Sequence, residues 1–150
     1  MLNTDFSNAE NKSMNTFTRS VDFLQRAMSV NSLRFQVTAN NVANAGVPNY
    51  KRQEVNFESE LRRALESEKN PSPLNLATSD ERHIQLNEPY DWREVEPRRV
   101  TDWTSTANAN GNNVDVEKEA MDVLRIQESY RLLSQLTNFQ FNQVKTAMKK

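Results

Sequence analysis

Apolar residues recur at spacings of three and four in two long stretches, one near each end of the chain, and this predicts two amphipathic helices. The N-terminal stripe consists of Phe17, Val21, Leu24, Met28, Phe35, Val42 and Ala45. The C-terminal stripe consists of Val116, Ala120, Val123, Ile126, Tyr130, Leu133, Val144 and Ala147, and Leu132, Leu136 and Phe139 widen its apolar face. Such seams are typical of paired helices. We therefore expect a mainly α fold in which the two terminal helices pair as an antiparallel, coiled-coil-like axial domain.

Helix-breaking residues divide the chain into three parts. The only glycines are Gly46 and Gly111, and all five prolines lie between them. A glycine followed closely by a proline is a common helix stop, so Gly46 and Pro48 predict where the first helix ends. The two terminal segments contain no breaker.

These boundaries suggest a domain organisation. Residues 1–16 are polar and unpatterned, and we expect them to form a disordered extension. Residues 17–46 and 112–150 would form the helical axial domain. Residues 47–111 would form a loop-rich middle segment with a short helix over 57–67 and short strands over 83–86 and 93–100. Its aromatic residues (Tyr90, Trp92 and Trp103) are expected to anchor a small core, with a subunit interface as the alternative role. Residues 108–113 are expected to form a flexible joint.

The expected helix lengths favour an assembly. At 1.5 Å per residue the helices would run about 40 Å and about 50 Å. A compact globule of this chain length is a little under about 40 Å wide. Helices as long as the globule imply a rod-like molecule whose wide apolar face packs against neighbours.

Composition narrows the function classes. The hydrophobic fraction is 36% and the mean hydropathy is -0.84, values typical of a chain that completes its burial against partners. The net charge of -1 argues against a nucleic-acid binder, because the basic pairs are diluted by glutamates. The absence of cysteine excludes disulfides and thiolate sites. No apolar run resembles a membrane span or a secretory signal.

Catalytic chemistry finds little support in the sequence. The single histidine, His83, lies near Asp80 and Glu81, but nothing nearby would complete a metal shell. Two glycines placed far apart cannot form a phosphate-binding loop. We therefore expect no enzyme activity, no cofactor and no metal.

Two motifs resemble those of bacterial flagellar rod and hook proteins. The segment from Ala39 to Tyr50 reads ANNVANAGVPNY and is similar to the ANNxAN…TPGY signature at the end of that family's N-terminal helix. The segment from Asn113 to Glu119, followed by Tyr130, is similar to the NVDxxxE…Y opening of its last helix. Both motifs occur in the right order, and residues 23–34 are most similar to a proximal rod subunit.

The chain departs from the family pattern at two positions. Val47 stands where the family prefers threonine, and Asn49 stands where it prefers glycine. The second change is mild, because asparagine tolerates positive φ better than other residues with a side chain. The asparagines of the motif can offer their amides to unpaired carbonyls or to neighbouring chains.

The resemblance implies a structural subunit of the flagellar basal-body rod, exported without a cleaved signal peptide and transmitting torque from motor to hook. Its partners would be other rod subunits, basal-body proteins, copies of itself and the flagellar export apparatus. The alternative is a cytosolic helical adaptor or chaperone that binds partner helices. The residues expected at assembly interfaces are Leu24, Met28, Phe35, Ala39, Asn40, Asn41, Val42, Ala43, Asn44, Pro48, Tyr50, Val116, Val123, Tyr130, Leu133, Leu136, Phe139 and Val144.

Overall fold

The structure, a computed structural model, describes residues 4–69, 90–105 and 108–149, with side chains from residue 16 onward. The expected strand over 83–86, and His83 with it, lies outside these ranges. Two long helices dominate the fold, α1 (Thr4–Ala43) and α3 (Val116–Met148). None of the described helices combines the length and the hydropathy that crossing a bilayer requires.

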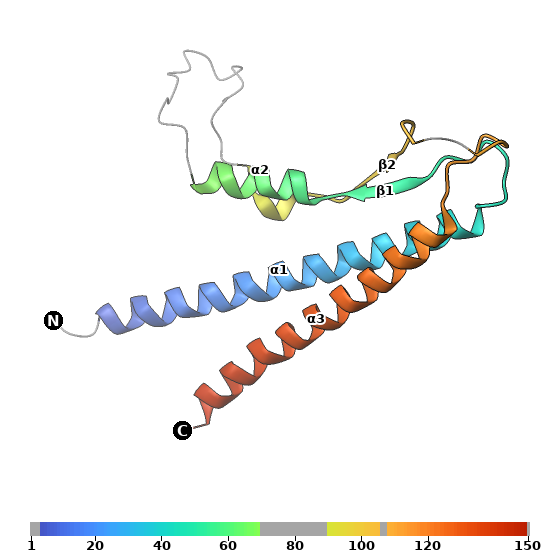
Figure 1. Cartoon of the computed structure of the whole chain (residues 1–150). Helices are drawn as coiled ribbons and strands as arrows, with labels where there is room; N and C mark the ends of the chain where they lie inside the picture. The colour runs from blue at the N-terminus through green and yellow to red at the C-terminus, as the bar shows by residue number, and fades with distance from the viewer. Residues whose placement is uncertain (1–3, 70–89, 106–107, 150) are drawn as a thin grey trace, which may run out of the picture.

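The two long helices run antiparallel, which confirms the predicted fold class. Contacts are spread along the pair. Asn41 bonds to Glu119, Asn31 bonds to Ser129, and the Phe17 ring meets the Phe141 ring edge to face at 5.7 Å. Figure 1 shows the helices close together where the connecting segments join them and diverging towards the chain termini, which lie at the same end of the molecule.

The first helix differs from its expected extent at both ends. It begins at Thr4, within the segment expected to be disordered; no glycine or proline interrupts that segment. It ends at Ala43, and Gly46 does not adopt the left-handed conformation expected of a glycine helix stop. Instead, the chain reverses through successive backbone hydrogen bonds within residues 44–50, such as those from Val47 to Asn44 and from Tyr50 to Val47.

Positive φ occurs where the two connections meet. Asn49 has φ 61° and Gly111 has φ 79°. The Asn49 backbone N–H donates to the carbonyl oxygen of Asn110 at 3.1 Å, which joins the two turns. Asn49 therefore adopts the positive φ that the sequence suggested asparagine could tolerate at this position.

A small lobe (residues 57–69 and 90–97) and a two-stranded ribbon make up the described middle of the chain. Strands β1 (Gln53–Asn56) and β2 (Arg98–Thr101) pair antiparallel, with Gln53 opposite Thr101. Helix α2 (Glu58–Lys69) confirms the expected short helix with slightly shifted ends. A 3-10 turn, η1 (Trp92–Glu94), occupies the start of the strand expected over 93–100, because the Asp91 side chain caps it by accepting from the Arg93 N–H. Strand β1 was not predicted.

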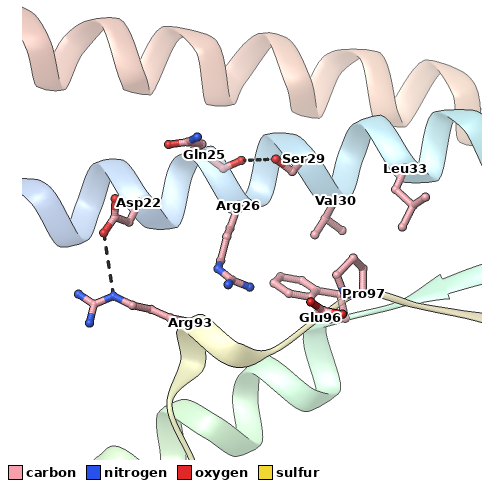
Figure 2. Close-up of a pocket in the computed structure, with 10 residues that line it drawn as sticks. Asp22, Gln25, Arg26, Ser29, Val30, Leu33, Arg93, Glu96 and Pro97 are labelled. Carbon is pink, nitrogen blue, oxygen red and sulfur yellow. Dashed lines mark hydrogen bonds and ion pairs between the residues drawn. The ribbon is translucent and has the colours of Figure 1, made fainter.

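The apolar core is small and lies beside α1. It contains Val30 of α1 together with Phe57, Ala64, Trp92 and Val95. Trp92 is a core anchor as expected, but the prediction is wrong for Trp103, which is 75% exposed, and for the exposed Tyr90. Both views show α1 between α3 on one side and the lobe on the other (Figures 1 and 2).

The conformation of Gly111 generates a prediction about the connection. Replacing Gly111 by alanine should destabilise the fold by about 1–2 kcal/mol, because a side chain disfavours positive φ. The added Cβ would also lie 2.4 Å from the Asn49 Oδ1 atom. Denaturant unfolding measures the change.

Gly46 supplies the matched control. A Cβ there meets no atom within 4 Å and its φ is not positive, so Gly46→Ala should be neutral or slightly stabilising. Equal losses of stability in the two variants would contradict this account of the turn.

Candidate functional site: a buried polar cluster between the terminal helices

The most unusual feature of the molecule is a cluster of buried polar side chains at the closed end of the helix pair. We define this polar cluster by five residues with exposed fractions of 7% or less: Asn41, Arg52, Asn112, Asn113 and Glu119. They come from the end of α1, the turn before β1, the segment before α3, and the first turns of α3. All three parts of the chain therefore meet at this point.

The amide of Asn41 joins helix α1 to strand β1. Its Oδ1 atom accepts from the Gln53 backbone N–H at 3.0 Å, and its Nδ2 atom donates to the Gln53 carbonyl oxygen at 2.8 Å. The amide thus pairs with the strand as a neighbouring backbone would. Nδ2 also donates to the Glu119 Oε2 atom at 3.2 Å, so one side chain ties together α1, β1 and α3.

A charged pair forms the centre of the cluster. The Glu119 side chain is fully buried, and its Oε1 atom accepts from the Nε–H of Arg52, whose side chain is 7% exposed. Arg52 also contacts the carboxylates of Glu54 and, at 3.4 Å, Asp122. A buried carboxylate is tolerated only when it is paired and hydrogen-bonded, and Glu119 meets both conditions.

Two adjacent asparagines close the connection before α3. The Nδ2 atom of Asn112 donates towards three carbonyl oxygens after α1, those of Asn44, Ala45 and Val47, at 2.8–3.0 Å. The carbonyl oxygens of Asn44 and Val47 also accept from the backbone N–H groups of Val47 and Tyr50, so Asn112 reinforces the turn that follows the helix. Asn113 accepts from the Arg52 backbone N–H at 2.7 Å. The expected flexible joint is therefore wrong for these two residues, which are buried and hydrogen-bonded.

Helix α3 begins directly beyond this connection. Asp115 is its N-cap and accepts from the backbone N–H groups of Glu117 and Lys118. This capping, with acidic residues in the first turn, complements the helix dipole as expected. It places Glu119 one turn into the helix, facing Arg52.

Tyr50 links the cluster to the motif that precedes it. Its hydroxyl donates to the Asn41 Oδ1 atom at 3.2 Å. Burial raises the pKa of Tyr50 above its usual value of 10.0, and the negative charge of Glu119 raises it further. The neutral phenol is therefore favoured in the folded protein.

The hydrogen bonding of the cluster is suited to holding structure. Among the side chains that the structure describes, every buried polar atom has a hydrogen-bond partner. No group of three or more potential metal ligands forms within the same residues. A fully satisfied buried network fixes one geometry, so the cluster acts as a rigid joint between α1 and α3.

The residues expected at interfaces fall into three groups. Asn41 and Tyr50 belong to the joint and make contacts within the chain. Half-buried residues are Leu24, Met28, Asn44, Val123, Leu133 and Val144. Exposed residues are Phe35, Ala39, Asn40, Val42, Ala43, Pro48, Val116, Tyr130, Leu136 and Phe139.

Sequence reasoning missed Arg52 and Asn112 and gave Glu119 no role. Asn113 and Glu119 stand within the second motif, and Arg52 follows the first at a distance of two residues from Tyr50. The signal that could have found them is the charge of Glu119. An acidic residue that is buried at the start of a helix needs a charged or hydrogen-bonding partner elsewhere in the chain.

The charged pair generates a stability prediction. Arg52→Met alone should cost about 3–5 kcal/mol, because it leaves the buried Glu119 carboxylate without a charged partner. Glu119→Leu alone should cost less, because Arg52 keeps its contacts with Glu54 and Asp122. The double variant should lose much less than the sum. Denaturant unfolding of all four chains gives the coupling energy.

The exposed pair of Glu60 and Arg63 in α2 is the control, since its arginine side chain is 72% exposed. Arg63→Ala should change the unfolding free energy by no more than about 1 kcal/mol. Additive losses at Arg52 and Glu119 would show that the two residues do not act as a pair.

The raised pKa of Tyr50 generates a pH prediction. The folded state holds the phenol proton more tightly than the unfolded state, so this contribution to stability is present below pH 10 and is lost as the pH rises through the folded-state pKa. The part of the tyrosinate absorbance titration that disappears in Tyr50→Phe should have a midpoint above 10. A midpoint at or below 10 would contradict the burial of this hydroxyl against Glu119.

Comparison with known proteins identifies relatives of this chain. The family model for flagella basal body rod proteins matches residues 22–51, which include the first motif. The chain is 40% identical to the flagellar basal body rod protein FlgB of Borreliella burgdorferi over 91% of its own length and all of that protein. It is 35% identical to FlgB of Borrelia hermsii, again over 91% of this chain and all of that one. Identity to FlgB of Bacillus subtilis is 30%, over 90% of this chain and 97% of that protein. The two motifs joined by the polar cluster thus lie in a chain that belongs to the FlgB family of flagellar basal body rod proteins.

Proposed function

We propose that this protein is a structural subunit of the proximal rod of the flagellar basal body, assembled through its terminal helices. Membership of the FlgB family supports the rod assignment. The observation that carries the assembly mechanism is an apolar stripe on α3 that no described part of the chain covers. Its residues are Met121, Leu124, Leu132, Leu136 and Phe139, each 43–57% exposed.

The stripe lies beside the seam with α1 and widens the apolar surface of α3. Ile126, Leu133 and Val144 are half-buried, and the helical period places them roughly 100–140° around the helix from Leu132 and Phe139. A helix whose apolar surface is wider than one seam can pack against its own partner with one part and against another chain with the rest. Contiguous exposed apolar surface of this kind marks protein interfaces.

The polar cluster supports a role in carrying torque. Torque passes through a rod only if each subunit keeps its shape under load. Because the cluster fixes α1 to α3 through Asn41, Arg52 and Glu119, twisting one helix turns the other. A structural role of this kind requires no catalytic group and no cofactor.

The division of the chain follows from the same proposal. The axial domain would comprise residues 17–46 and 112–150, with the extension before it and the middle segment outside the helix pair. Neighbouring copies, other rod subunits and basal-body proteins would cover the exposed interface residues. Export would proceed through the flagellar export apparatus without a cleaved signal peptide, as the resemblance implies.

Charge placed on the α3 stripe tests the proposal. Leu136→Lys combined with Phe139→Lys should leave the helical circular dichroism of the purified protein unchanged, because both side chains are exposed. Cells in which this chain replaces the natural one should lose swimming, since lysines resist burial at an interface. Electron microscopy of their basal bodies should show no complete rod.

Asn138→Lys is the matched control, because Asn138 is exposed on another side of the same helical turn. Swimming should persist in that variant. Normal rods in cells that carry the Leu136→Lys and Phe139→Lys variant would contradict the assembly proposal. Retention of the natural protein in the cytoplasm would favour the adaptor or chaperone alternative.

A further inference from the structure

A lobe formed by residues 57–69 and 90–97, which include α2 and η1, lies on the side of α1 away from α3 (Figure 1). Charged side chains of α1 make four polar contacts with it among the described residues. These contacts are Arg19 with Glu68 at 2.6 Å, Asp22 with Arg93 at 4.0 Å, Arg26 with the Val95 carbonyl oxygen, and Arg34 with Glu58. The three arginines recur at intervals of seven and eight residues, which puts them in one row along α1.

The row and the lobe have complementary charges. Arg19 and Arg34 meet carboxylates at opposite ends of α2. Burial alone would raise the pKa of Glu58, but the hydrogen bond and the charge of Arg34, with backbone hydrogen bonds, hold it below its usual value. Both pairs remain partly exposed to solvent, unlike the pair at Glu119.

Apolar packing between the lobe and α1 is slight. Val30 is the one residue that α1 contributes to the buried core described above, and the other members belong to the lobe itself. Phe23 approaches the Trp92 ring at 5.9 Å but stays 40% exposed. The backbone of α1 packs closely on α3 and β1, whereas its contacts with α2 come chiefly from long side chains.

Cavities remain where the lobe meets α1. One has a volume of about 530 Å³ and another about 230 Å³. Figure 2 shows the larger one, with Asp22, Arg26 and Leu33 projecting from α1 towards Arg93 and Pro97. The larger cavity is open to solvent, so the lobe of the same chain covers this surface only in part.

The lobe is joined to the rest of the described structure only through the β1–β2 ribbon. The far end of this ribbon is held to the polar cluster, by Asn41 on Gln53 and by Asn113 on Asp102. The lobe can therefore leave α1 by bending where β1 and β2 end, without disturbing the joint between α1 and α3.

From these observations we propose that the arginine row of α1 is a docking surface for the acidic lobe of a second copy of this chain. In this arrangement two copies exchange lobes, each lobe lying on α1 of the other copy. The proposal rests on the proposed function, because rod assembly brings copies side by side. A lobe exchanged between identical chains makes the same ion pairs, so exchange costs little once the copies are close.

Charge reversal tests docking between chains. One variant carries Arg19→Glu and Arg34→Glu, and the other carries Glu58→Arg and Glu68→Arg. In each variant the lobe and α1 of the same chain repel each other, whereas between the two variants every reversed pair is attractive. Mixed in equal amounts at low salt, they should form a heterodimer, seen by light scattering, at least about tenfold tighter than either variant with itself.

A second measurement leaves the pattern of charges nearly natural. The chain contains no cysteine, so Arg34→Cys in one tagged chain and Glu58→Cys in another give single reactive thiols. A short bis-maleimide should join the two chains only when the lobe of one lies on α1 of the other. Lys145→Cys, in the last turn of α3, replaces Arg34→Cys as the control. Salt at 1 M should suppress the product by screening exposed pairs beyond about 3 Å.

The proposal is overturned if the charge-reversed variants keep their helical circular dichroism but remain monomeric when mixed. It is also overturned if the cross-linked yield with Arg34→Cys does not exceed that with Lys145→Cys. Neither result would touch the rod assignment, which depends on the α3 stripe and is tested by swimming and rod formation.

Discussion

The Glu119 carboxylate is completely removed from solvent, and the shape of the molecule depends on how that charge is compensated. A buried ion without a partner costs several kcal/mol, so the pairing of Arg52 with Glu119 strongly favours this arrangement of the chain. Arg52 directly precedes β1, so its bond to Glu119 positions that strand. Asn41 bonds to both Gln53 and Glu119, which places the end of α1 at the same point. One electrostatic requirement thus sets the relation between both long helices and the ribbon.

Fixing the helices at one end leaves their other ends weakly held. Beyond the cluster, the polar and aromatic contacts between α1 and α3 within the described residues are well separated, such as Asn31 with Ser129 and Phe17 with Phe141. The helices diverge towards the termini (Figure 1), and apolar side chains of α3 remain in water. Burial of that surface is favourable, so a subunit of this shape gains stability by meeting neighbours.

The molecule uses charge in two physically different ways. The pair of Arg52 and Glu119 is shielded from water and salt, which makes the joint strong and geometrically specific. The pairs of Arg19 with Glu68 and Arg34 with Glu58 are partly exposed, so each contributes little and responds to ionic strength. A rigid joint and an exchangeable lobe therefore coexist in one short chain.

The sequence by itself determined the two long helices, their antiparallel pairing and the family, because helix periodicity, breaker positions and local motifs are all readable along the chain. It also indicated the positive φ of Asn49 from the chemistry of asparagine alone. Only the tertiary structure decided that Asn112 and Asn113 are buried, that β1 pairs with β2, and that Trp103 is exposed. These features depend on partners tens of residues away, such as Arg52 for Glu119, and no local pattern specifies which distant charge compensates a buried one.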